Sequence, residues 1–232
     1  MIELRKAQER GATRLPWLDS RHSFSFGEYY DQKHLGFSVL RVINDDRIAA
    51  GGGFPSHPHR DMEIITYVMQ GALEHRDSLG NNSVIPAGDV QRMTAGSGIM
   101  HSEFNHSKSE PVHLLQIWIL PERNGLTPGY EQKTLEKDPE RGQLRLVVAP
   151  QAGNGALRIN QDARLYIGTF DAGQSAAAEI ERGRRAYFHV ARGKLSINGA
   201  ELGEGDAALL TNERRADLSA ASGAEVLFFN LP

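Results

Sequence analysis

Two pairs of residues of the types that commonly bind metals lie near one another in the chain. His57 and His59 are two positions apart, and so are His101 and Glu103. Successive side chains of a β-strand point to opposite faces of the sheet, so residues i and i+2 share a face. If both segments are extended neighbours in a closed sheet, four nitrogen and oxygen donors converge on one interior point. Three imidazoles and a carboxylate suit a divalent transition metal, with coordination positions left for a substrate.

Other interpretations of these residues stay open at this point. Isolated histidine pairs at i and i+2 are usually surface features, but two ligand pairs that are each framed by glycines favour metal binding. Glu63 has the same strand parity as His57 and His59, so it could face the same interior. Spacing alone does not choose between a ligating Glu63 and a buried Glu63 that is hydrogen bonded to a neighbour.

Composition excludes several kinds of site and partner. The 232 residues include no cysteine, so disulfides, cysteine-ligated zinc, iron–sulfur clusters and a thiol nucleophile are ruled out. A formal net charge of −3 gives no electrostatic reason to expect nucleic acid or an anionic membrane as a partner. No apolar run approaches the roughly 20 residues that span a bilayer. The first residues, MIELRKAQERG, lack the apolar region of a secretory signal, so we expect a cytoplasmic protein.

The elements that must position the ligand pairs are short strands separated by turns. Residues 37–43 and 63–69 are rich in β-branched side chains, and the first is followed by a polar turn at 44–46. Residues 73–77 lead into the turn SLGNN, which predicts a hairpin. Residues 112–120 are apolar on both faces and are predicted to be buried. No stretch of ten or more residues shows helical periodicity, so the pattern predicts an all-β sandwich or barrel.

The chain is predicted to form two domains. Residues 121–143 combine proline, glycine and mixed charge, which is typical of a linker. The strand-and-turn rhythm then resumes, and VARGKLSINGAELGEGDAALL is similar in style to residues 68–90, which indicates two related barrels in tandem. We therefore predict an N-terminal metal-binding domain over residues 1–130 and a C-terminal domain over residues 131–232. The second has a lone His189 and no HxH motif, so we expect it to be metal-free.

These residues also match the two motifs of the cupin superfamily. The first motif is a glycine, an HxH pair, a glutamate and a glycine, and it fits Gly51, His57, His59, Glu63 and Gly71. The second fits Gly80, Pro86, Gly88, Gly98, His101 and Asn105, with an insertion between its halves. The insertion, together with AGSGIMHSEFN and QIWILPERNGLTPGYEQK, makes the chain resemble the pirin family of that superfamily. The resemblance covers nearly the whole chain and is strongest up to about Lys133.

The resemblance implies a fold and a metal site. It implies an all-β bicupin of two tandem antiparallel β-barrels of the jelly-roll type. It makes His57, His59, His101 and Glu103 the metal ligands and leaves Glu63 outside the ligand set. It implies one divalent metal, Fe(II) in the first place, with Mn, Co, Ni, Cu or Zn as alternatives.

The resemblance also implies an activity: the dioxygenation of flavonols such as quercetin, with O2 as co-substrate and release of carbon monoxide. In that scheme the flavonol 3-hydroxyl binds the metal and Glu103 accepts its proton. The expected partners are a small aromatic substrate and O2, and the expected state is a monomer. Some pirins are instead non-catalytic, redox-responsive regulators that act through protein partners. Such a regulator would need the same four ligands, so the motif does not discriminate between the two functions.

Gln116 and the histidines outside the ligand set have simpler expected roles. Gln116 is a polar residue in the apolar strand 112–120, so it could reach the cavity or orient a ligand. The remaining histidines are most simply surface or hydrogen-bonded residues. They are His22, His34, His75, His106, His113 and His189.

Overall fold

The chain forms two compact units, each built from antiparallel strands. The computed structural model describes residues 1–135, 140–151, 153 and 155–232. The N-terminal unit consists of Gly11–Lys137 and Ile159–Gln161, and the C-terminal unit of Met1–Arg10, Asp138–Arg158 and Asp162–Pro232. Among the described residues the helical structure is limited to one 3-10 turn, Ala7–Glu9, and none forms a helix able to cross a membrane. The predicted all-β, double jelly-roll class is confirmed.

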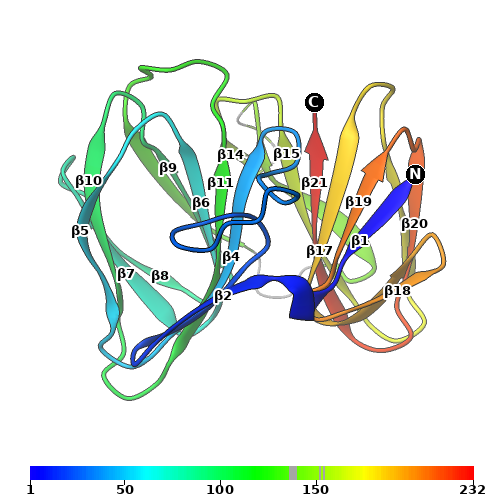
Figure 1. Ribbon diagram of the computed structural model, residues 1–232, viewed down its shortest axis with the longest axis horizontal. Helices are drawn as coiled ribbons and strands as arrows, with labels where there is room; N and C mark the ends of the chain where they lie inside the picture. Colours follow the sequence, from blue (N-terminus) through cyan, green and yellow to red (C-terminus); the bar gives the residue numbers. More distant parts are fainter. Residues whose placement is uncertain (136–139, 152, 154) are drawn as a thin grey trace. The chain divides into compact units, whose positions relative to one another are not determined.

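Two sheets make up the N-terminal unit (Figure 1). The larger has the order β12-β9-β6-β11-β4-β3-β2 and the smaller the order β5-β10-β7-β8. The strands of the larger sheet are β2 (Gly11–Leu15), β3 (Leu18–His22), β4 (Leu40–Ile48), β6 (Glu63–Gln70), β9 (Asp89–Thr94), β11 (Val112–Ile119) and β12 (Gly129–Thr134). Those of the smaller are β5 (Gly53–His59), β7 (Ala72–Asp77), β8 (Asn82–Pro86) and β10 (Ile99–Asn105). The predicted hairpin is confirmed as β7 and β8.

Side chains between the two sheets form two apolar clusters with polar positions between them. One cluster joins Leu114 of β11 to Leu73 of β7, and the other joins Ile64 of β6 to Ile99 of β10. Trp118 packs against the second cluster. Because side chains of a strand alternate, Gln116 faces the same interior as Leu114 and Trp118, midway between the clusters. The space between the sheets therefore has a polar layer enclosed by apolar ones.

One local prediction was wrong. Asn44, Asp45 and Asp46 do not form a turn but lie buried in β4, where each finds a hydrogen-bond partner. The Nδ1 atom of His22 lies 2.7 Å from Asn44, the Nε2 atom of His113 lies 2.7 Å from Asp45, and Ser20 donates to Asp46. Three consecutive polar residues indicate a turn when their side chains are hydrogen bonded to water. Here the side chains of neighbouring strands provide the hydrogen bonds instead, so the three residues can be buried in a strand.

The predicted linker, residues 121–143, contains a strand as well as the limit between the two units, and its residues 136–139 lie outside the described part of the chain. Residues 129–134 form β12, which pairs antiparallel with β9. β12 lies at the edge of its sheet, where glycine, proline and charged residues are tolerated. The compact units thus differ from the ranges 1–130 and 131–232 in three places. The N-terminal unit extends to Lys137 and includes Ile159–Gln161, and Met1–Arg10 belongs to the C-terminal unit.

The C-terminal unit is built around β17 (Arg185–Ile197), a long strand that pairs with β19 and β21 in its first part and with β18 and β20 in its second. Its other strands are β1 (Ile2–Arg5), β13 (Gln143–Ala149), β14 (Leu157–Arg158), β15 (Arg164–Phe170), β16 (Ser175–Glu179), β18 (Ala200–Gly203), β19 (Ala207–Thr211), β20 (Arg215–Ser219) and β21 (Ala224–Leu231). The rings of Phe188 and Phe228 stack in its core at 4.6 Å. β1 completes the sheet by pairing with β19 (Figure 1).

Candidate metal centre

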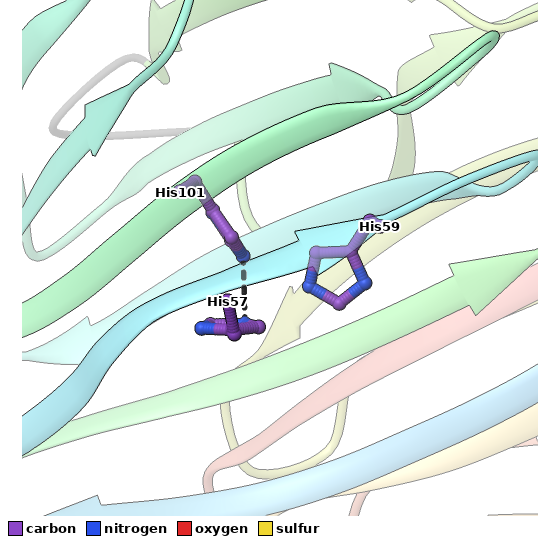
Figure 2. A group of neighbouring side chains, drawn as sticks. All are labelled: His57, His59 and His101. Carbon is purple, nitrogen blue, oxygen red and sulfur yellow. Dashed lines mark hydrogen bonds between the residues drawn. The ribbon is translucent and has the colours of Figure 1, made fainter.

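Strands β5 and β10 bring the two predicted ligand pairs together. They are antiparallel neighbours, with His101 opposite His57 and Ile99 opposite His59. The ring centroids of the three histidines are 4.5–4.8 Å apart, and Figure 2 shows the rings converging from the two strands. One nitrogen of each ring lies within 4.8 Å of the others. The i and i+2 spacing therefore produces a cluster of imidazoles, as predicted from strand parity.

Glu103 lies on the same face of β10, which is buried at every second residue from Ile99 to Asn105. Its Oε2 atom accepts a hydrogen bond of 2.9 Å from the amide of Gln116. Its Oε1 atom is buried and has no hydrogen-bond partner among the described residues. An unpaired buried carboxylate oxygen is costly unless a cation or a proton donor satisfies it.

Glu63 is placed differently. Its Oε2 accepts a hydrogen bond of 3.0 Å from Thr94 and its Oε1 one of 3.2 Å from Asn160. Burial raises the pKa of Glu63, and these hydrogen bonds oppose the rise. Both oxygens are already used by the protein, so Glu63 has the geometry of a hydrogen-bonded buried carboxylate.

Two imidazoles of the cluster, those of His59 and His101, are held neutral. Burial, followed by the neighbouring imidazoles, lowers the pKa of His101 to about 3 and that of His59 to about 4. The Nδ1 atom of His57 lies 2.7 Å from the carbonyl oxygen of Pro55. Because a carbonyl only accepts, this Nδ1 carries a proton, and in the neutral form of the ring the Nε2 of His57 has a lone pair. That Nε2 lies 3.1 Å from the Nε2 of His101 (dashed in Figure 2).

The residues present fit a divalent transition metal. Metal-binding imidazoles must be neutral, and burial favours the neutral form of His59 and His101. The unpaired Oε1 of Glu103 adds an anionic oxygen at the same interior face, and Gln116 fixes its other oxygen as the sequence suggested. Nitrogen with oxygen donors suits zinc, iron, nickel or copper more than calcium or magnesium.

His75 is a member of the cluster that sequence reasoning did not single out. It is fully buried, its Nδ1 lies 3.4 Å from the Nδ1 of His101, and its Nε2 lies 3.1 Å from Asp77. A second set of donors within 4.8 Å of one another consists of His75, His101 and Glu103. The signal for His75 was its position opposite Glu103 on β7, which is visible only once β7 is known to pair with β10.

Comparison with known proteins decides the family. Residues 3–119 match the Pirin family model, and residues 146–231 match the model described as the quercetinase C-terminal cupin domain. The chain belongs to the pirin family. The pirin match alone covers half of the chain, and the two matches fall within the two predicted domains.

Relatives that match this pirin over their whole length are named quercetin 2,3-dioxygenase or putative quercetin 2,3-dioxygenase. This pirin is 48% identical over 232 residues to quercetin 2,3-dioxygenase of Escherichia coli (strain K12), covering 100% of this chain and 99% of that one. It is 45% identical to a putative quercetin 2,3-dioxygenase of Pseudomonas aeruginosa, over 98% of each chain. Its fold is similar to that of bacterial pirin YhhW of Escherichia coli in complex with nickel(II), with TM-score 0.96, 47% identity and coverage of 100% and 99%.

A hollow of about 410 Å³ opens beside the histidine cluster of this pirin. It is lined by Pro58, His59, Arg60, Ser78, Gly98, Ile99 and Met100. The ring of His59 also contacts the ring of Trp118 edge to face, with centroids 5.0 Å apart. An aromatic substrate that reached His59 would thus find apolar and aromatic surface next to the imidazoles.

Proposed function

We propose that this pirin is a metal-dependent dioxygenase that opens the heterocyclic ring of flavonols such as quercetin, consuming O2 and releasing carbon monoxide. The observation that carries the proposal is the cluster of the His57, His59 and His101 imidazoles, with the unpaired carboxylate oxygen of Glu103 close to His101 and a hollow beside His59. The names of the full-length relatives support the substrate class. The cytoplasmic location and the monomeric state stay predictions.

We assign His57, His59, His101 and Glu103 as the residues that would hold the metal. Fe(II) is our preferred ion, and the nickel(II) complex of the related pirin supports a site that accepts several divalent ions. When bound, such an ion supplies a Lewis-acidic centre with positions left for substrates. We expect the C-terminal unit to be metal-free.

Within this site Glu103 is the proposed catalytic base. Gln116 holds its Oε2, which leaves Oε1 to serve in turn as a metal ligand and as the acceptor of the flavonol hydroxyl proton. A deprotonated flavonol is electron-rich and is therefore more readily oxidised. Trp118 and the apolar residues of the hollow would bind the aromatic rings and exclude water from them.

The test is turnover by purified protein that has been loaded separately with Fe(II), Ni(II), Mn(II) or Zn(II). Given quercetin in air, the active metal form should consume many equivalents per protein, with one O2 taken up for each carbon monoxide released. Glu103→Gln should slow turnover by about 10²–10⁴-fold, the usual contribution of a general base. If quercetin loss stays stoichiometric with every metal, the enzyme proposal fails, and a search for protein partners becomes the next experiment.

A further inference from the structure

Asp77 is a buried carboxylate at the end of β7 and lies outside the proposed ligand set. Its side chain is fully buried. Its Oδ1 accepts hydrogen bonds from the backbone amides of Leu79 (2.9 Å) and Asn81 (3.1 Å), and its Oδ2 accepts one of 2.9 Å from the Asn81 side chain. The turn between β7 and β8 thus fixes this carboxylate in place and in its charged, accepting form.

The pKa of Asp77 agrees with that description. Burial on its own would raise it, but hydrogen bonds from Asn81, His75 and Leu79 outweigh burial and hold it below the ordinary value. A carboxylate that is ionised can only accept hydrogen bonds.

His75 is therefore oriented by its contact with Asp77. Its Nε2 atom lies 3.1 Å from Oδ2 of Asp77, so Nε2 carries a proton. In a neutral imidazole the other nitrogen, Nδ1, is then an acceptor. The ring is held in this position by Tyr130, whose ring lies 4.8 Å away at an interplanar angle of 31°.

The tautomer of His101 follows from that of His75. Its Nδ1 lies 3.4 Å from Nδ1 of His75, which accepts, so Nδ1 of His101 donates. Its Nε2 then has no proton and faces Nε2 of His57 at 3.1 Å. Since the proton of His57 is held by Pro55, two lone pairs point at each other across this gap. Two facing lone pairs repel, and a cation that both nitrogens coordinate removes the repulsion.

We infer that Asp77 and His75 are positioning residues that fix the tautomer of His101 and so prepare its Nε2 for the metal. The register brings the three together, because Asp77 lies opposite His101, and His75 opposite Glu103, on β7 and β10. The inference rests on the proposed function only in taking the histidine cluster as the metal centre, and it needs no particular substrate.

The chain of hydrogen bonds also makes His101 a better ligand. A carboxylate that accepts from an imidazole raises the basicity of the far nitrogen, and loss of such an outer partner typically lowers metal affinity about 10–100-fold. Here the carboxylate acts through a second imidazole, so both Asp77 and His75 contribute to the orientation of His101.

The experiment compares His75→Leu with His75→Asn and uses Zn(II) as the probe. Leucine removes the acceptor and leaves the Nδ1 proton of His101 buried without a partner. Asparagine can place its Oδ1 near the position of the lost Nδ1 and still accept. We expect His75→Leu to bind Zn(II) about 10–100-fold more weakly than the unmodified protein and His75→Asn to recover most of that loss, as measured by chelator competition. Equal affinities for the unmodified protein and His75→Leu would overturn the inference.

A second measurement uses the unmodified protein and does not depend on how the variants fold. Long-range ¹H–¹⁵N correlation of the Zn(II)-loaded protein distinguishes imidazole tautomers. We expect His75 to be protonated at Nε2 only, and His101 to be protonated at Nδ1 with Nε2 bound to Zn(II). A doubly protonated His75, or a His75 bound directly to Zn(II), would refute the positioning role. Neither measurement involves quercetin, so both can succeed where flavonol turnover fails.

Discussion

Single residues of the N-terminal unit show what strand parity can predict and what it cannot. His57 with His59, and His101 with Glu103, are pairs within one strand, so their shared face follows from local sequence alone. His75 contacts His101 from another strand, and that contact depends on which strands pair. The burial of Asp46 in β4 could not be predicted from local sequence either, because it depends on the hydrogen bond from Ser20 in β3.

Asp46 gives a prediction about pH. Burial raises its pKa to about 7, the carboxylates of Asp45 and Glu103 add to the rise, and a hydrogen bond from Ser20 opposes it. In the unfolded chain the pKa is near 3.9. As pH rises above 4 the unfolded state loses this proton first, so the free energy of unfolding falls with rising pH up to about 7. Asp46→Asn should remove this decrease, roughly 1–3 kcal/mol between pH 5 and pH 8.

Urea unfolding of the metal-free protein at pH 5, 6, 7 and 8 measures the effect. The exposed Glu110→Gln is the matched control and should leave the slope unchanged. Parallel stability curves for the unmodified protein and Asp46→Asn would show that Asp46 keeps its charge throughout.

At the scale of elements, the closeness of β5 and β10 decides the geometry of the site. Their register shifts between His101 and Glu103, so a β-bulge separates the two ligands of β10. Gly53 is the first residue of β5 and lies opposite Phe104 of β10. A Cβ added there would overlap the backbone of Glu103 and lie 2.6 Å from the Cα of Phe104.

Gly53→Ala should therefore push β5 away from β10. We expect a loss of roughly 1–3 kcal/mol in the free energy of unfolding, the usual cost of an overpacked site. We also expect weaker metal binding, since His57 and Glu103 would move apart. Gly129→Ala in β12 is the control, because its Cβ would meet only the Arg92 side chain at an ordinary 3.5 Å. Calorimetry with and without Zn(II) gives both quantities, and equal behaviour of the two variants would contradict the prediction.

For the whole molecule, the sequence predicted two β units and their class but not their exact limits. Edge strand β12 has a linker-like composition, and β1 pairs with a strand far along the chain, so neither could be assigned from local patterns. Each unit has its own apolar core, with Phe188 and Phe228 in one and Leu114 and Ile64 in others. The proposed ligands all lie in the N-terminal unit.

Metal binding should therefore stabilise one unit selectively. A ligand at 100 times its Kd adds about 2.7 kcal/mol to the stability of the state that binds it. In hydrogen exchange, Zn(II) should raise the protection of β5 and β10 and leave β17 and β21 unchanged. His101→Ala should abolish the rise in β5 and β10 while β17 and β21 exchange as before. Loss of protection in β17 and β21 on that substitution would show that the C-terminal core depends on the ion.

The pairing of β1 with β19 has a consequence for synthesis on the ribosome. Lys6 and the backbone amide of Ala7 bind Asp206, and Ile2 lies opposite Leu210, so β1 is completed by a segment that is synthesised 200 residues later. At translation rates of about 5–20 residues per second, this segment waits on the order of 10–40 s for its partner. Throughout that interval the nascent chain carries an unmatched β-segment, available to chaperones and to neighbouring chains alike.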